Sequence, residues 1–169
     1  YRGGKDGTTF VAGSMDEMVV GNKIGPEVGF IDNFTSTNKI AIVKWAFGGT
    51  SLNSEWLTSG GWAWEGFKDT IDDARSQLLG LNYDPNFKGI IWFQGESDSE
   101  NSTRANAYAQ NLSSLMGAMR TYLSNVNIPL VIAGIDSSDH PSYPYTTTVR
   151  DAQIAFANTQ DHTAFVDAS

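Results

Sequence analysis

The sequence contains no cysteine, so it can form neither a disulfide framework nor a zinc–thiolate site. Its only imidazoles are His140 and His162, which are too few for a histidine-rich metal site, and we expect neither a metal nor another cofactor. Basic residues are also scarce, because the formal net charge is −8 and no long basic run occurs. A surface for nucleic acid or for an anionic membrane is therefore not expected, and the composition favours a neutral or polar small molecule or polysaccharide as partner.

Long apolar runs are missing as well. No run approaches the roughly 20 residues that a helix needs to cross a bilayer, and residues 1–5, Tyr-Arg-Gly-Gly-Lys, do not begin a signal peptide. We expect a soluble protein with a secreted or periplasmic location. A length of 169 residues with 40% hydrophobic composition suits one domain, 1–169, around a single core.

Short, densely apolar stretches alternate with longer amphipathic ones along the chain. The apolar and β-branched stretches predict strands at 39–47, 88–94, 128–135 and 163–168. Apolar residues spaced by three and four, together with capping residues, predict helices near 26–34, at 66–80, from about 101 to 122, and at 147–159. This alternation predicts an α/β fold of three layers, a parallel sheet with helices on both faces.

Two of the predicted strands end in unusual polar loops. Gly48-Gly49-Thr50 follows the first strand, and Gln94-Gly95-Glu96-Ser97-Asp98 follows the second. Ligands of parallel sheets bind beyond the carboxyl ends of the strands, and glycine N–H groups beside a carboxamide donor are the parts of an oxyanion hole. The alternative is that the first loop is an ordinary turn and that the second only caps the next helix.

The segments "GPEVGF", "KWAFGGTSL" and "WFQGESD" occur in this order, and "VRDAQ" is followed by "FVDAS" near the end. Together they resemble the sialate O-acetylesterase and acetylxylan esterase branch (carbohydrate esterase family 6) of the SGNH hydrolases. The resemblance covers nearly the whole chain. It implies a flavodoxin-like fold that hydrolyses acetyl esters on sugars through a serine, a histidine and usually an aspartate.

Residue by residue, the resemblance assigns Gly48 or Gly49 as a backbone N–H donor to the oxyanion and Gln94 as a side-chain amide donor. Glu96 and Asp98 would support these loops. The expected substrate is an acetylated carbohydrate of the acetylxylan or sialate type.

Three further residues are candidates for substrate contacts. His140, in "DSSDHPSYP" after the third strand, suits a substrate-shaping loop better than a catalytic base. Trp56 lies in "SEWLTSGGWAW", where an aromatic ring suits a sugar face, although tryptophans that close the top of the sheet are expected equally. Thr50 is a hydroxyl of the glycine turn with no evident base beside it.

Two turns that the resemblance requires are absent from the sequence. The G-Q-S-N-M-like nucleophile turn does not precede "GPE", and the D-G-x-H-like turn does not follow "FVD". Ser14 in "FVAGSMDEM" lies too close to "GPE" for the nucleophile and is interpreted as a loop serine. We therefore expect the central portion of the domain, without its first strand and last helix, and a complementary segment that carries the nucleophile serine and the catalytic histidine.

Two alternatives to the esterase remain open at this stage. One is a catalytically degenerate carbohydrate-binding domain of the same fold. The other is a metal-dependent hydrolase that uses Glu96, Asp98 and His140, and it is the weaker of the two because the acids have no second histidine beside them.

Overall fold

A computed structural model describes residues 39–138 and 140–168. The chain divides into two compact units, one made of Tyr1–Ala46 with Phe67–Pro85 and the other of Phe47–Gly66 with Asn86–Ser169. The second, called here the sheet unit, contains the described sheet and the predicted site. The helix predicted near 26–34 and Ser14 lie outside the described residues.

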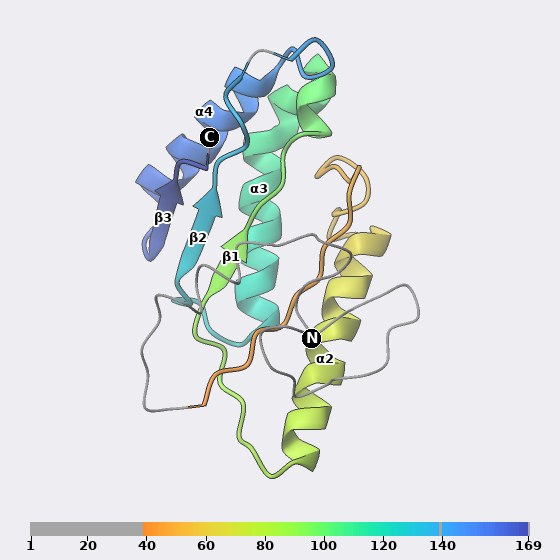
Figure 1. Cartoon of the computed structure of the whole chain (residues 1–169), viewed down its shortest axis with the longest axis vertical. Helices are drawn as coiled ribbons and strands as arrows, with labels where there is room; N and C mark the ends of the chain where they lie inside the picture. Colours follow the sequence, from red (N-terminus) through yellow and green to blue (C-terminus); the bar gives the residue numbers. More distant parts are fainter. Residues whose placement is uncertain (1–38, 139, 169) are drawn as a thin grey trace. The chain divides into compact units, whose positions relative to one another are not determined.

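Three short strands form the sheet: β1 (Ile90–Trp92), β2 (Leu130–Ala133) and β3 (Thr163–Val166). They lie in the order β1-β2-β3, and both pairs are parallel (Figure 1). Ile90 pairs with Leu130, which pairs in turn with Thr163. Three of the predicted strands and the α/β parallel class are thus confirmed.

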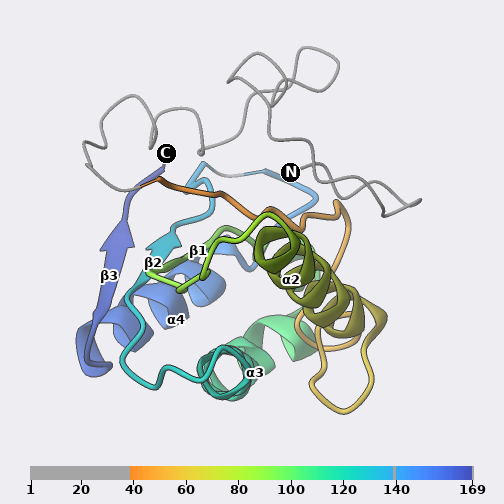
Figure 2. The same cartoon turned by 90° about the horizontal axis from the view of Figure 1, so that it is seen from below.

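Two long helices connect the strands, α3 (Ser102–Tyr122) and α4 (Thr146–Thr159). Both crossovers run in the same direction along the sheet, so right-handed connections place the two helices on the same face, as Figure 2 shows. Asn101 caps α3, because its side chain accepts hydrogen bonds from the backbone N–H groups of Thr103 and Arg104. The apolar stripe predicted for this helix is its buried side, which includes Leu112, Leu115, Met116 and Met119.

Helix α2 (Trp62–Gly80) begins four residues before the predicted helix and ends where predicted. A glutamate in its first turn, Glu65, suits the positive end of the helix dipole. None of the helices in the described ranges is long and apolar enough to cross a membrane.

The strand predicted at 39–47 is wrong. These residues have no regular secondary structure, and Ile40 at its start is half exposed. Apolar, β-branched composition favours an extended backbone, but a strand also needs a neighbouring strand to accept and donate its ladder hydrogen bonds. None of the described strands pairs with this segment.

Candidate functional site

The two predicted site loops meet within the sheet unit. Gln94 lies two residues beyond β1, and its side-chain Nε2 donates a hydrogen bond to the backbone oxygen of Thr50 over 2.8 Å. The Gly48-Gly49-Thr50 turn therefore lies directly beside the loop that follows β1. The two loops meet as expected, although the glycine turn follows an irregular segment and not a strand.

Asp98 connects the two loops from below the surface. It is 0% exposed, its two carboxylate oxygens accept from the Leu52 N–H over 3.0 and 3.1 Å, and Oδ2 also accepts from Gln94 Nε2 over 2.7 Å. Burial raises the pKa of Asp98 because it disfavours the charged carboxylate, although the bond from Gln94 and the Arg104 guanidinium act in the opposite direction. Asp98 thus joins the two loops, and its supporting role in the reaction stays a prediction.

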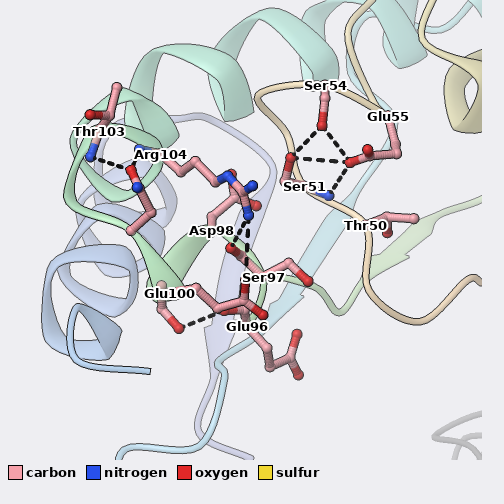
Figure 3. Close-up of polar contacts among 12 residues, drawn as sticks. Thr50, Ser51, Ser54, Glu55, Glu96, Ser97, Asp98, Glu100, Thr103 and Arg104 are labelled. Carbon is pink, nitrogen blue, oxygen red and sulfur yellow. Dashed lines mark hydrogen bonds and ion pairs between the residues drawn. The ribbon is translucent and has the colours of Figure 1, made fainter. Parts of the chain in front are cut away.

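Glu55 holds the other side of the glycine turn, and the sequence analysis did not identify it. Its Oε2 accepts from the Ser51 N–H at 2.8 Å, from Ser51 Oγ at 3.1 Å and from Ser54 Oγ at 2.6 Å (Figure 3). Partial burial opposes the charge, but these hydrogen bonds outweigh it and lower the pKa of Glu55. The carboxylate therefore stays charged and fixes the backbone just after Thr50. Serines one and four residues before an acid in a turn were the available sequence signal.

The N–H groups of Gly48 and Gly49 are available to a ligand. Both glycines are exposed, and no hydrogen bond within the described ranges uses either N–H. Gly49 has φ +73°, a conformation that side chains other than hydrogen adopt only with strain. The turn thus presents backbone donors next to the Gln94 side chain.

The Gln94 side-chain amide already donates both of its hydrogens within the protein, which the sequence did not suggest. It has two N–H hydrogens, and its nitrogen donates to Thr50 O and to Asp98 Oδ2. Its Oε1 is buried without a hydrogen-bond partner. Gln94 can therefore donate to an oxyanion only by exchanging one of its two present bonds.

Thr50 and Trp56 were candidates for substrate contacts, but both are buried, at 4% and 5% exposure. The Thr50 hydroxyl donates to Phe47 O and accepts from Trp56 Nε1, each over 3.0 Å. The Trp56 ring packs edge-on against Trp92 with 4.9 Å between centroids. This packing favours the structural alternative, in which the tryptophan closes the core and does not offer its face to a sugar.

His140 is exposed and lies at the rim of a hollow of about 300 Å³ whose lining includes Tyr143 and Thr147. Its Nδ1 accepts from the Ser142 N–H over 3.1 Å, so the neutral ring carries its proton on Nε2. A ring in this tautomer has a hydrogen-bond donor at its outer nitrogen. The hollow adjoins the site loop, because the Tyr145 N–H donates to Ser99 O over 3.0 Å.

Glu96, the other predicted supporting acid, is exposed, and its carboxylate makes no hydrogen bond in the part of the chain that the structure describes. Within the same ranges, no group of three or more histidine, aspartate or glutamate side chains could hold a metal ion. The alternative of a metal site formed by Glu96, Asp98 and His140 has no support in this geometry.

Two buried side chains that the sequence analysis missed contact the backbone of the site. The Tyr108 hydroxyl, from α3, and Gln153 Nε2, from α4, each donate to the backbone oxygen of Gln94 over 2.9 Å. Burial raises the pKa of Tyr108, so its hydroxyl keeps its proton as a donor. The sequence signal was a polar residue within the apolar stripe of a predicted helix.

Residues 12–169 match the model of a family described as carbohydrate esterase, sialic acid-specific acetylesterase. A solved structure of a protein from Arabidopsis thaliana, determined by X-ray crystallography at 1.6 Å resolution, is similar, with a TM-score of 0.59 and 26% sequence identity. The similarity covers 72% of this chain and 45% of the plant protein, so the chain spans less than half of that relative. No curated protein matches the chain in sequence.

Proposed function

Since the chain belongs to the sialic acid-specific acetylesterase family of carbohydrate esterases, which are ester hydrolases, we propose that it serves the removal of O-acetyl groups from sugars or polysaccharides. The reaction is acyl transfer through a serine, on an acetylated carbohydrate of the acetylxylan or sialate type. The observation that carries this proposal is the placement of the Gln94 amide against the glycine turn, 2.8 Å from Thr50 O. We also propose a secreted or periplasmic location for the protein.

In the proposed mechanism, the N–H of Gly48 or Gly49 and the Gln94 side chain stabilise the tetrahedral oxyanion. Gln94 exchanges its bond to Thr50 O for a bond to the oxyanion, because a charged oxygen is a stronger acceptor than a neutral carbonyl. Asp98 retains the other amide hydrogen and so keeps the side chain oriented. A bond that forms only in the transition state raises kcat and not substrate affinity.

We assign the nucleophile to none of the described residues. The Ser51 hydroxyl, which lies nearest the glycine turn, bonds to Ser54 and Glu55 and has no histidine among these partners. The serine and histidine of the reaction would come from the complementary segment expected from the sequence. Glu96, exposed at the mouth of the loop, and His140, with an N–H on its outer nitrogen, are proposed to face the carbohydrate.

The test is Gln94→Ala in the complete enzyme, assayed on 4-nitrophenyl acetate and on an acetylated xylo-oligosaccharide. Loss of one oxyanion donor costs about 2.7–4 kcal/mol, so kcat should fall by roughly a hundredfold or more. Circular dichroism should show an intact fold. The matched control is Gln110→Ala, an exposed glutamine of α3, which should leave kcat unchanged. Near-normal turnover of a folded Gln94→Ala enzyme would refute the assignment.

A further inference from the structure

The carboxyl ends of β1 and β2 separate just beyond their ladder, and a glutamine side chain fills the gap. The last ladder pair is Trp92 with Ile132. Beyond it, Gln153 of α4 donates from Nε2 to Gln94 O over 2.9 Å and accepts at Oε1 from the Ile135 N–H over 3.3 Å. The side-chain amide thus takes the place of a peptide group between two strand ends that no longer reach each other.

The same carbonyl oxygen has a second buried donor. Tyr108 Oη donates to Gln94 O over 2.9 Å and also lies 3.2 Å from Gln153 Nε2. Both side chains are 0% exposed. Two donors saturate the lone pairs of one carbonyl, so the peptide between Gln94 and Gly95 is held from α3 and from α4 at once.

Packing restrains the next residue from the same side. Gly95 has φ +153°, and a Cβ there would lie 2.9 Å from Val149 Cγ1 and 3.0 Å from Ile135 Cγ2. The chain therefore touches α4 along the whole Gln94-Gly95 step. It has no room to shift toward the helix, and the two hydrogen bonds oppose a shift away from it.

We propose that Gln153 is a positioning residue of the esterase reaction, which acts with Tyr108 by fixing the Gln94 backbone so that the Gln94 amide lies where the oxyanion forms. This inference rests on the proposed function. An apolar side chain could fill the same volume, but it could not hold two strand ends at a set separation. Burying an amide is costly unless it is fully bonded, and here three of its contacts are made inside the protein.

The experiment is a double-mutant cycle in the complete enzyme, with kcat and KM measured on 4-nitrophenyl acetate. Gln153→Met keeps the volume and removes the amide. Because misplacement of a reacting group by about 1 Å can cost a hundredfold, kcat should fall by about tenfold or more while KM changes little. In the Gln94→Ala background, Gln153→Met should cause no further loss of kcat, because it acts only through Gln94.

A merely structural role gives a different result, in which Gln153→Met lowers kcat by the same factor in both backgrounds or changes only the folded fraction. That result would overturn the inference and leave the proposed function intact. Normal turnover of Gln94→Ala alone would overturn the proposed function and the inference with it. The matched control is Gln160→Met, at the exposed end of α4, with no expected effect.

If Gln153→Met does not fold, Tyr108→Phe replaces it. This variant removes one donor to Gln94 O and almost no volume. It should lower kcat in the Gln94 enzyme and not in the Gln94→Ala enzyme. Equal effects in both backgrounds would again contradict the positioning role.

Discussion

The loops that follow β1 and β2 start from the same edge of the sheet but are built differently. After β1, the side chains of Gln94 and Asp98 are buried and bond to a distant segment, at Thr50 and Leu52. After β2, the described polar side chains at 136–138, 140 and 142 are exposed, and the side-chain bonds among them join residues two positions apart. The buried contacts of the first loop suit the oxyanion donors proposed for it, and the local contacts of the second suit the carbohydrate-facing role proposed for it.

The largest effect should come from removing the acid that ties the first loop. Asp98→Ala would leave the Leu52 N–H and one Gln94 N–H buried without acceptors, each at a cost of about 1–3 kcal/mol. We expect a loss of about 2–4 kcal/mol of unfolding free energy, measured by urea denaturation. Glu96→Ala, two residues away and exposed, should stay within about 0.5 kcal/mol. If Asp98→Ala and Glu96→Ala lost equal unfolding free energy, the buried contacts of Asp98 would not hold the first loop.

Gly95→Ala tests the backbone of the same loop. The added methyl meets Val149 and Ile135 at 2.9 and 3.0 Å, and φ of +153° strains any side chain. Overpacking and backbone strain predict a loss of about 2 kcal/mol or more, seen as a lower Tm. Gly117→Ala is the matched control, because it lies inside α3 with open space around it and should stabilise by about 0.5–1 kcal/mol. A neutral Gly95→Ala variant would mean that the loop yields readily.

A substitution in the second loop should have a smaller effect, and it should change KM and not the stability of the fold. His140→Ala removes an exposed ring from the rim of the hollow, so unfolding free energy should change by less than about 0.5 kcal/mol. We expect a severalfold rise in KM for an acetylated oligosaccharide and no change for 4-nitrophenyl acetate, with kcat retained. A large loss of kcat on both substrates would instead give His140 a direct role in the chemistry.

The smallest expected effect is on titration, and it compares Asp98 in the first loop with Asp136 in the second. Burial raises the pKa of Asp98, whereas hydrogen bonds from the Ser138 backbone and side chain lower the pKa of Asp136. The proton-linked part of the Asp98 contribution to stability is thus present at low pH and lost as pH rises through its raised pKa; the hydrogen bonds that it accepts from Leu52 and Gln94 are a separate contribution. That of Asp136 is present above its ordinary pKa and lost as pH falls through the lowered value. Carboxyl NMR titration should resolve the two, and Ser138→Ala should move only Asp136. Coincident titration of the two groups would contradict the contrast.

Much of the sheet unit was predictable because its elements carry their own patterns. Continuous apolar runs marked all three strands, and residues 101–103 all suited a helix cap by type, of which the structure assigns Asn101. The same apolar pattern at 39–47 failed, because composition does not reveal whether a partner strand is present. The glycine turn was expected beside Gln94 because two parallel strands were predicted to lead there, but 39–47 is not a strand, so the contact between Gln94 and Thr50 has another basis.

The remaining site residues depend on contacts that sequence spacing does not encode. An aromatic residue in a polar loop, such as Trp56, gives no indication of which way its ring turns. Gln153, in contrast, could have been found, since it lies four residues after Val149 and three before Phe156 on the buried stripe of α4. A single amide on such a stripe indicates a buried acceptor or donor that needs it.

The hydrogen bonds of the Gln153 side chain also affect amide hydrogen exchange just after β2. Gly134 donates its N–H to Val166 O, whereas the next N–H, of Ile135, has the Gln153 side chain of α4 as its one acceptor among the residues that the structure describes. Its exchange with deuterium therefore requires α4 to detach from the sheet, whereas exchange at Gly134 follows the separation of β2 from β3. The exchange rates of Gly134 and Ile135 thus measure two different local opening motions, and the one at Ile135 involves the residue that holds the Gln94 backbone.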